Sequence, residues 1–465
     1  MDANILSGKK VLMIAYGFPP IAHAGVYRTL RFCQYLPDNG WKPTVITIRE
    51  SKDIHSDHSL LKRIPEDVRV HRTATIDMWR VIRQYRAREA QRTAEPEAQG
   101  NAGRTGGLPA AVRRAKGLFF SILLRLFSIP DHMLFWVPFA MIKGAMLMTK
   151  EKFDVIYTTS PPHSEHLTGL ILSKIFRTPW VADLRDPIVG NFNTRDLSRL
   201  ELKLHEWLEK LIVRAADTVI VVTRYHQKAM QERHPDQRSK FIVIRNGFDP
   251  ALFENVQAAA FDKFTILFAG TLYGTITPDF FVRGLAKWLE TKDRSVRKDV
   301  QALFFGMGTE RAGTLARELG IGDVVKTSGL VPQTEIIQKL KGADLLLLII
   351  GNDSRSAGVI ASKLYEYMAL NRPILAIIPQ GETLEVLREY GNFHHAPHDD
   401  YGSLLSALDD AYGKYIRKDA DLSGPEKAAP VGSMYDVTVQ VKDLIHVFHS
   451  TSQAKSAEPG RQSVA

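Results

Sequence analysis

The stretch that decides the fold is Ser356-Ala-Gly-Val-Ile-Ala-Ser-Lys-Leu-Tyr-Glu-Tyr-Met-Ala-Leu370. Apolar runs of strand length flank it at 343–350 and 371–378. A strand, a small-residue loop, a helix and a second strand form a βαβ unit, which binds ligands where loops leave the carboxyl ends of its strands. The loop brings the free N–H groups of the helix N-terminus to an anion. Glu366 follows about one turn later, within reach of a sugar hydroxyl, so this stretch favours a nucleotide or nucleotide-sugar.

The rest of the chain repeats this alternation in two similar halves. Each half opens with a short apolar strand that closes on a glycine loop, at 10–15 and at 264–269. Ten further strands are predicted, at 44–48, 68–72, 154–158, 180–183, 218–222, 241–245, 302–305, 324–328, 344–350 and 374–378. Helical segments between them indicate parallel sheets covered on both faces. The expected fold class is α/β, with two Rossmann-like doubly wound parallel-sheet domains.

The length of 465 residues exceeds one ordinary core and predicts two domains. The predicted bounds are 1–248 and 249–430, with a hinge near 246–250 where Asn-Gly and Asp-Pro mark a turn. Residues 89–108 are poor in apolar side chains and predict a flexible loop, and 450–465 predict a disordered tail after a final helix.

The cysteine count and the hydropathy of the chain indicate which cellular compartment to expect. The single cysteine, Cys33, permits no internal disulfide and fits a reducing compartment. No uninterrupted apolar run approaches the roughly 18 to 20 residues of a spanning helix, and no convincing secretory signal is present. The predicted location is cytoplasmic.

The net charge of +10 is concentrated in one segment. Residues 78–150 hold 12 basic against 4 acidic side chains, and 112–150 combine this excess with apolar residues. The candidate membrane-contacting residues are Arg113, Arg114, Lys116, Phe119 and Phe120. Cations before a Phe/Leu-rich stretch are typical of a helix lying on an anionic membrane surface, and an ordinary core-packed helix is the alternative. No nucleic-acid partner is expected, because no aromatic-interleaved basic strand or recognised binding motif accompanies the charge.

Polar residues follow three strands of the first half. The loop after 10–15 offers Gly17, His23, Gly25 and Arg28 as a candidate phosphate or acceptor loop, with a ligand-free turn as the alternative. His163 follows the strand at 154–158, and Asp183-Leu-Arg-Asp186 closes the next strand. Neighbouring strand ends converge on one cleft. The candidate catalytic residues are therefore His163, Asp183, Arg185 and Asp186, and an ion pair between Asp183 and Arg185 is the structural alternative.

The opening loop of the second half, Gly270-Thr-Leu-Tyr-Gly274, can offer N–H and hydroxyl groups to phosphates. It carries no cation, which Arg245, Arg355 or Lys363 would supply from neighbouring loops; a plain turn is again the alternative. No metal and no cofactor are expected, because the chain has neither a Cys pair nor His-Glu-x-x-His. Its one Asp-x-Asp, at 419–421, is interpreted as a solvated loop.

Over roughly residues 10–448 the chain resembles the GT-B-fold glycosyltransferases of family 4, which are retaining enzymes that use nucleotide-sugar donors. The motifs that carry the resemblance are Phe18-Pro-Pro20 with Gly25 and Arg28, Ser160-Pro-Pro-His163, Asp183-Leu-Arg-Asp186, Ile244-Arg-Asn-Gly247, Phe268-Ala-Gly270, Gly329-Leu-Val-Pro332 and Ser362-Lys-Leu-Tyr-Glu366. The resemblance implies an acceptor-binding first domain, a donor-binding second domain, a cleft between them, and a helix at 431–449 that returns to the first domain.

The resemblance also implies roles for single residues. Glu366 would bind the donor ribose, and the backbone after Gly329, at Leu330 and Val331, would hold the base. The diphosphate would be held by Gly270, Thr271 and Gly274 together with Ser362, Lys363 and Leu364.

The chain departs from the family pattern at three places. Gly358 stands where the family often has the first glutamate of Glu-x7-Glu. The basic residues usual after the Gly270 loop are absent, and the family's first-domain histidine aligns near Thr159, which makes His163 an approximate substitute. The Ser-Lys-Leu-x-Glu variant is familiar among bacterial surface-polysaccharide transferases that act on lipid-linked acceptors.

The predicted function is a retaining, metal-independent transfer of a hexose from a nucleotide-sugar to a hydroxyl of a lipid-linked saccharide, by an enzyme peripheral to the inner face of the cytoplasmic membrane. Two alternatives stay open. One is a nucleotide-sugar 2-epimerase of the same fold, and the other is a catalytically degenerate, membrane-associated subunit of a polysaccharide assembly complex.

Overall fold

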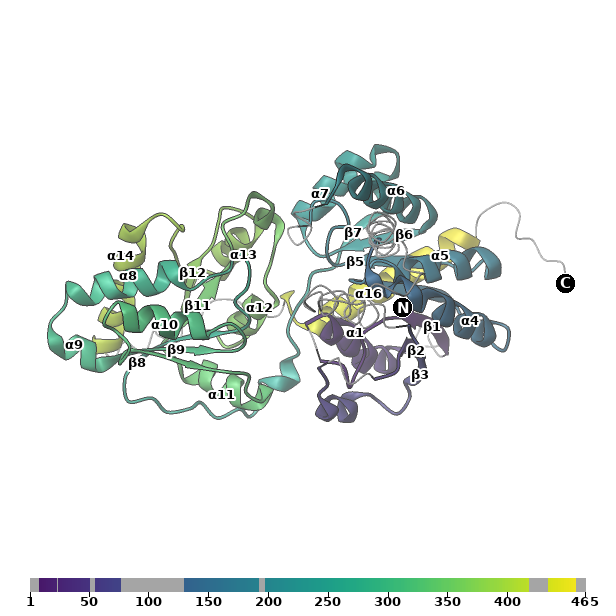
Figure 1. The fold of residues 1–465 in the computed structure, drawn as a ribbon. Helices are drawn as coiled ribbons and strands as arrows, with labels where there is room; N and C mark the ends of the chain where they lie inside the picture. Colours follow the sequence, from purple (N-terminus) through teal and green to yellow (C-terminus); the bar gives the residue numbers. More distant parts are fainter. Residues whose placement is uncertain are drawn as a thin grey trace, which may run out of the picture. The chain divides into compact units, whose positions relative to one another are not determined.

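The computed structural model describes residues 8–22, 24–50, 55–76, 129–191, 197–417 and 434–456. The chain forms two compact units (Figure 1). The first unit contains residues 1–221, 230–242 and 444–465, and the second contains 222–229 and 243–443.

A seven-stranded sheet organises the first unit, in the order β3-β2-β1-β4-β5-β6-β7. The strands are β1 (Lys9–Ile14), β2 (Trp41–Ile48), β3 (Arg69–Thr73), β4 (Val155–Ser160), β5 (Trp180–Leu184), β6 (Thr218–Val221) and β7 (Phe241–Val243). Among the described residues, the α-helices that begin in this unit are α1 (Ala24–Tyr35), α4 (Val137–Met148), α5 (Glu165–Phe176) and α6 (Arg199–Ala215). Its short 3-10 helices in the same ranges are η1 (Pro37–Asn39), η2 (His58–Arg63), η3 (His132–Trp136) and η4 (Pro235–Lys240). The strand pairs from β3 to β6 are all parallel. The strand order changes direction between β1 and β4, and sheets of this kind bind ligands at such a switch point. The loops after β1 and β4 flank it.

The second unit repeats the plan with six strands, in the order β10-β9-β8-β11-β12-β13, all pairs parallel. The strands are β8 (Phe264–Ala269), β9 (Val300–Phe305), β10 (Val325–Ser328), β11 (Leu345–Ile349), β12 (Ile374–Ile377) and β13 (Phe393–His395). The helices are η5 (Pro250–Leu252), α8 (Asp279–Glu290), α9 (Arg294–Asp299), α10 (Glu310–Glu318), α11 (Gln333–Gly342), η6 (Ser354–Gly358), α12 (Ser362–Ala369), α13 (Glu382–Tyr390) and α14 (Tyr401–Arg417). Here the switch point lies between β8 and β11.

The apolar run of β11 explains the two covered faces. Leu345, Leu347 and Ile349 pack into the core formed with α8, α10 and α14. Leu346 and Leu348 point the other way, into the core formed with α11, α12 and α13. Because side chains alternate along a strand, a continuous apolar run is stable only with a core on each side. The predicted α/β class with two doubly wound parallel sheets is confirmed.

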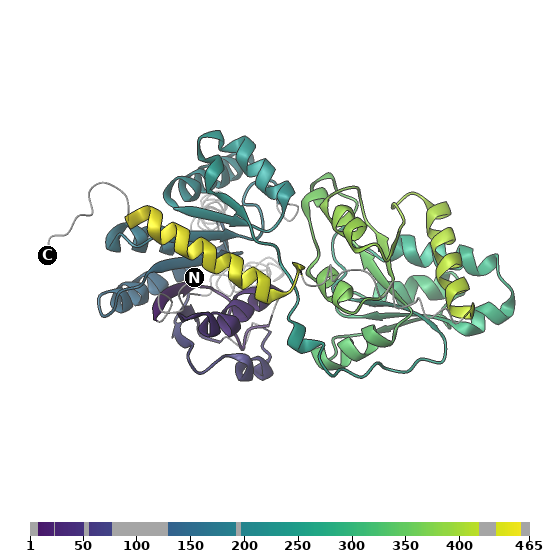
Figure 2. The same cartoon turned by 180° about the vertical axis from the view of Figure 1, so that it is seen from behind.

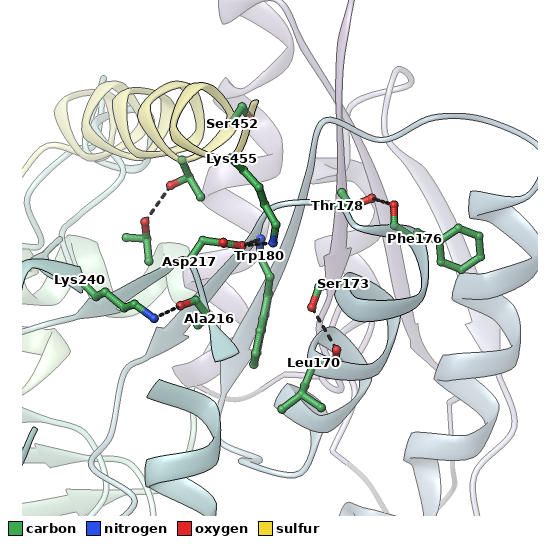
Figure 3. Close-up of polar contacts among 12 residues, drawn as sticks. Leu170, Ser173, Phe176, Thr178, Trp180, Ala216, Asp217, Lys240, Ser452 and Lys455 are labelled. Atoms are coloured by element: carbon green, nitrogen blue, oxygen red, sulfur yellow. Dashed lines mark hydrogen bonds and ion pairs between the residues drawn. The ribbon is translucent and has the colours of Figure 1, made fainter. Parts of the chain in front are cut away.

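The C-terminal part of the final helix, α16 (Val437–Ser456), lies along the first unit (Figure 2). Phe448 packs against Trp41, with 5.0 Å between the ring centroids. The Lys455 Nζ lies 2.6 Å from the Asp217 carboxylate, which also accepts the backbone N–H of Trp180 (Figure 3). The prediction that the tail begins at 450 was wrong, because α16 continues to Ser456.

The limits of the units differ from the predicted 1–248 and 249–430. The second unit begins at residue 243 and takes in 222–229, the start of α7 (Arg224–Arg233). The predicted hinge at 246–250 lies inside this unit. Phe248 there donates its N–H to the Tyr435 carbonyl at 3.0 Å and accepts the N–H of Val437 at 3.0 Å. Turn signals locate a bend in the chain, but these backbone contacts decide to which unit the bend belongs.

Several predictions fall outside the described residues. They concern the loop at 89–108, the candidate membrane residues Arg113, Arg114, Lys116, Phe119 and Phe120, the Asp-x-Asp at 419–421, and His23. Of segment 112–150, residues from 129 onward are described, as η3 and α4. Within the described ranges, no helix combines the length and apolarity needed to cross a bilayer.

Candidate functional site

Glycines bring three chain segments together at the carboxyl edge of the second sheet. Gly270, directly after β8, has a φ of +147° and donates its N–H to the Phe305 carbonyl at 2.9 Å. A Cβ at Gly306 would lie 2.0 Å from the Gly270 oxygen, and a Cβ at Gly270 would lie 2.3 Å from the Lys363 Nζ. Only glycine allows this approach, both for its backbone angle and for the space available.

Lys363 brings a cation to this glycine loop. It is the second residue of α12, and its Nζ lies 4.1 Å from the centroid of the Phe268 ring. Burial lowers the pKa of the Lys363 amine to about 8, and the Glu366 carboxylate opposes that shift. A lysine at a helix N-terminus, next to a glycine loop, is an arrangement that binds phosphates.

Glu366 lies one turn after Lys363 and is partly exposed. The adjacent Tyr367 fixes this part of the helix, because its hydroxyl accepts the Ala269 N–H at 3.1 Å. The hydrogen bond ties α12 to the end of β8. Glu366 is therefore held near both Lys363 and the Gly270 loop, as the sequence motif predicts.

The other two candidate cations have partners of their own. Arg355 forms an ion pair with Asp353 in the same loop, at 3.1 Å. Arg245 donates to the Tyr435 hydroxyl at 2.7 Å and lies 3.5 Å from Glu382. Lys363 is thus the one of the three that the structure places against the Gly270 loop.

The remaining donor-site candidates differ in exposure. Leu330 is 62% exposed after β10, and Val331, Thr271, Ser362 and Gly274 are also at least partly exposed. Leu364 is different, because its side chain is fully buried in the core and its N–H donates to the Ala361 carbonyl at 2.9 Å. The side chain and the N–H of Leu364 are therefore both engaged within the protein, and this residue packs α12 against the core.

The place of the missing glutamate is occupied by a tyrosine. A Cβ at Gly358 would lie 2.3 Å from the Tyr225 Cδ1. Tyr225 is itself held, because its N–H donates to Glu382 at 2.6 Å. A side chain at this position would therefore have to displace the Tyr225 ring, a constraint that the sequence pattern alone did not reveal.

In the first unit, Asp183 and Arg28 form a buried ion pair. Asp183 is fully buried and accepts the Arg28 Nε at 2.7 Å and the Tyr157 hydroxyl. The pairing expected as an alternative, with Arg185, is not formed. Arg185 instead donates to the Ser160 carbonyl at 2.8 Å and the Pro161 carbonyl at 3.2 Å. The geometry favours a structural role for Asp183 and Arg28.

His163 and Asp186 lie at the carboxyl edge of the first sheet. His163 is buried, and its Nδ1 lies 3.1 Å from the Ser160 Oγ. Burial lowers the pKa of His163, while the carboxylates of Asp131 and Asp186 oppose the shift. Asp186 is partly exposed. The loop glycines Gly17 and Gly25 are also partly exposed.

Glu165, which no sequence motif pointed to, joins two loops of this edge. Its fully buried carboxylate accepts the Tyr16 N–H at 2.8 Å and the Thr159 N–H at 3.0 Å. Burial raises the pKa of Glu165 well above its usual value. The signal was an acidic residue two positions after His163, at the first turn of α5. Within the described ranges, no three His, Cys, Asp or Glu side chains gather in a group that could hold a metal ion.

Known proteins share features of this chain. Residues 25–247 match the family described as glycosyl transferase 4-like domain, and no curated protein sequence matches the chain. A crystal structure of Anabaena HepE in complex with UDP-glucose has a TM-score of 0.61 at 14% identity, covering 95% of this chain and 100% of that one. A Rickettsia africae glycosyltransferase gives 0.61 at 13% identity, covering 95% and 98%. Sucrose-phosphate synthase from Thermosynechococcus elongatus gives 0.61 at 15%, covering 96% and 100%.

The structural similarities confirm the predicted GT-B fold. The match of residues 25–247 to the glycosyl transferase 4-like domain supports the predicted enzyme class, a glycosyltransferase, and the resemblance to family 4.

Proposed function

We propose that the protein transfers a hexose from a nucleotide-sugar to a hydroxyl of a lipid-linked saccharide, with retention of configuration and without a metal ion. The proposed setting is bacterial surface-polysaccharide biosynthesis at the inner face of the cytoplasmic membrane. The observation that carries the donor half is the approach of Lys363 to Gly270, at the start of α12 and one turn before Glu366.

Each of these groups fits one part of a donor. The Lys363 amine and the helix N-terminus would meet the diphosphate, and the Glu366 carboxylate would accept hydroxyl hydrogens of the ribose. Anabaena HepE, which has the same fold, has been crystallised with UDP and with UDP-glucose. A uridine nucleotide is therefore the first donor to test.

The reaction breaks the bond between the anomeric carbon and the diphosphate oxygen, whose electron pair stays on that oxygen. The acceptor hydroxyl oxygen bonds to the anomeric carbon on the same face, and its proton passes to the departing phosphate. Negative charge thus grows next to Lys363. A cation held in advance at the site of developing charge lowers the barrier by about 3 to 4 kcal/mol in comparable cases.

The first unit would position the acceptor. Arg185 and Asp186 are partly exposed at the carboxyl edge of the first sheet. His163 lies at the same edge and is hydrogen-bonded to the Ser160 hydroxyl. The lipid link of the acceptor is proposed from the Ser-Lys-Leu-x-Glu motif and from the basic, apolar segment 112–150.

Calorimetric titration with uridine, UDP and UDP-glucose tests the donor site one group at a time. Lys363→Ala should weaken UDP binding by about tenfold or more while uridine binding changes little, since the amine contacts only the phosphates. Glu366→Ala should weaken all three ligands to a similar extent. Lys298→Ala, at an exposed position of α9, is the matched control and should bind like wild type. Unchanged UDP affinity in both site variants would remove the basis of the assignment.

A nucleotide-binding subunit without turnover is the second candidate. It is favoured by Gly358, whose place in the family pattern belongs to a glutamate and whose side-chain space Tyr225 fills. Incubating the protein with UDP-glucose and membrane lipids separates the candidates, because only a transferase yields a glycosylated lipid product. An epimerised nucleotide-sugar formed from donor alone would instead support the 2-epimerase.

A further inference from the structure

The outer face of α6 carries an apolar stripe. Leu200, Leu204, Trp207 and Leu211 follow one another at intervals of four, three and four residues, which places them on one side of the helix. Leu200 is 56% exposed and Trp207 61% exposed, whereas Leu204 and Leu211 are partly buried. The other tryptophans in the described part of the chain, Trp41, Trp136, Trp180 and Trp288, are all fully buried.

A row of cations borders this stripe. Arg199, Lys203, Lys210 and Arg214 are all exposed and recur at intervals of four, seven and four residues. Within the described part of the chain, no hydrogen bond or ion pair engages these four side chains. They lie on the side of Trp207 opposite the three leucines, because each successive residue turns by about 100°.

The acidic residues of α6 mostly face inward. Glu201 is buried in a capping box with Ser198, and Glu209 is buried against Arg233 and His234. Glu206 is the acidic side chain of this helix that is exposed. The outer face is therefore strongly positive as well as apolar.

The inner face of the helix is already packed. Leu208, Ile212 and Val213 are buried in the first unit, and the capping box fixes the first turn. On the outer stripe, by contrast, Leu200 and Trp207 remain mostly exposed.

We propose that the α6 face is a docking surface for an anionic lipid bilayer. Trp207 and Leu200 would enter the boundary between headgroups and acyl chains, where tryptophan side chains are favoured. The four cations would contact lipid phosphates. Charge complementarity decides for a membrane over a protein, because a row of cations beside a tryptophan and leucine stripe matches both layers of a bilayer surface.

This inference rests on the membrane location in the proposed function but not on its chemistry. Its residues belong to α6 and are not among the candidates between 113 and 120 of the sequence. Donor binding belongs to the second unit, so a failure of one proposal leaves the other measurable.

Sedimentation with vesicles tests the surface. Wild type should bind vesicles of phosphatidylglycerol and phosphatidylcholine, and much less well those of phosphatidylcholine alone. Lys203→Glu/Lys210→Glu should weaken binding to the anionic vesicles by about tenfold or more. The matched control, Arg294→Glu/Lys298→Glu on α9, makes the same change of charge at exposed positions and should bind like wild type.

Trp207 provides a second readout. Its emission should shift to the blue when anionic vesicles are added, and the shift should disappear in Trp207→Phe, which keeps most of the binding. Unchanged melting temperature and UDP affinity would show that the variants are folded. If the charge variant does not fold, Trp207→Ser tests the contribution of the α6 face to vesicle binding in the same sedimentation assay.

Three results would overturn the proposal: wild-type vesicle binding by the charge variant, binding that ignores lipid charge, or an unshifted Trp207 emission. A dimer in solution that Trp207→Ser dissociates would assign the face to a second copy of the chain instead.

Discussion

The carboxyl edges of the two sheets hold their charges in opposite ways. In the first unit, Asp183 is fully buried against Arg28, and Glu165 accepts two backbone N–H groups. In the second unit, Lys363 forms no hydrogen bond or ion pair with any described residue and contacts the Phe268 ring. A charge whose bonds are all internal holds loops in place, whereas a charge with bonding capacity left can bind a ligand. The difference favours a scaffolding role for Asp183, Arg28 and Glu165 and supports the proposal that Lys363 binds an anion.

Removing the buried carboxylate should have the largest effect on stability. Asp183→Ala leaves the Arg28 guanidinium buried without its partner, which should lower the free energy of unfolding by about 3 to 5 kcal/mol. Chemical denaturation followed by tryptophan fluorescence measures this loss. UDP affinity should not change. The double variant Arg28→Met/Asp183→Leu should be less destabilised than Asp183→Ala alone; an equal or larger loss would mean that the pair is not what stabilises this edge.

Adding one methyl group at Gly358 tests its close contact with the Tyr225 ring in the second unit. Gly358→Ala places a Cβ 2.3 Å from the Tyr225 Cδ1, and should cost about 1 to 3 kcal/mol of stability by overpacking. Tyr225→Ala in the same chain should recover most of that loss. Additive losses in the double variant, measured by thermal unfolding, would show that the two residues do not oppose each other.

The ion pair that anchors α16 should matter least. Lys455→Met removes the partner of Asp217, and both side chains are partly solvent-exposed. The expected loss is about 1 kcal/mol or less, because solvent screens such pairs and Asp217 keeps the Trp180 N–H. Lys339→Met, which breaks a similar pair with Glu335 on α11, is the control. A loss as large as that of Asp183→Ala would place this contact among the main supports of the first unit.

The strands could be predicted because their apolar runs depend only on local sequence. The run at 344–350 marked β11 correctly, since a strand buried on both faces needs no alternation. β13 was missed because it has three residues, two of them histidines, and shows no periodic signal. Its pairing with β12 comes from the rest of the sheet.

The site was predictable where one motif contained all its parts. Ser362-Lys-Leu-Tyr-Glu366 places Lys363 and Glu366 on one helix, so a single element fixes their spacing. Contacts between distant segments were not predictable, such as Arg28 with Asp183 or Tyr225 with Gly358. Their residues are more than a hundred positions apart, and only the folded chain brings them together.

In the proposed donor site, the Lys363 amine receives the diphosphate of the donor. Nitrogen-15 NMR of lysine amines, assigned with Lys363→Arg, measures it directly as a function of pH. We expect Lys363 to titrate with a pKa of about 8 in the free protein. UDP-glucose should raise this pKa, because the bound anion stabilises the protonated amine. UDP-glucose affinity should then fall as the pH rises from about 7 to 9, as the free amine loses its proton. An amine that titrates near the ordinary lysine value of about 10.4 and does not respond to UDP-glucose would show that Lys363 does not bind the diphosphate.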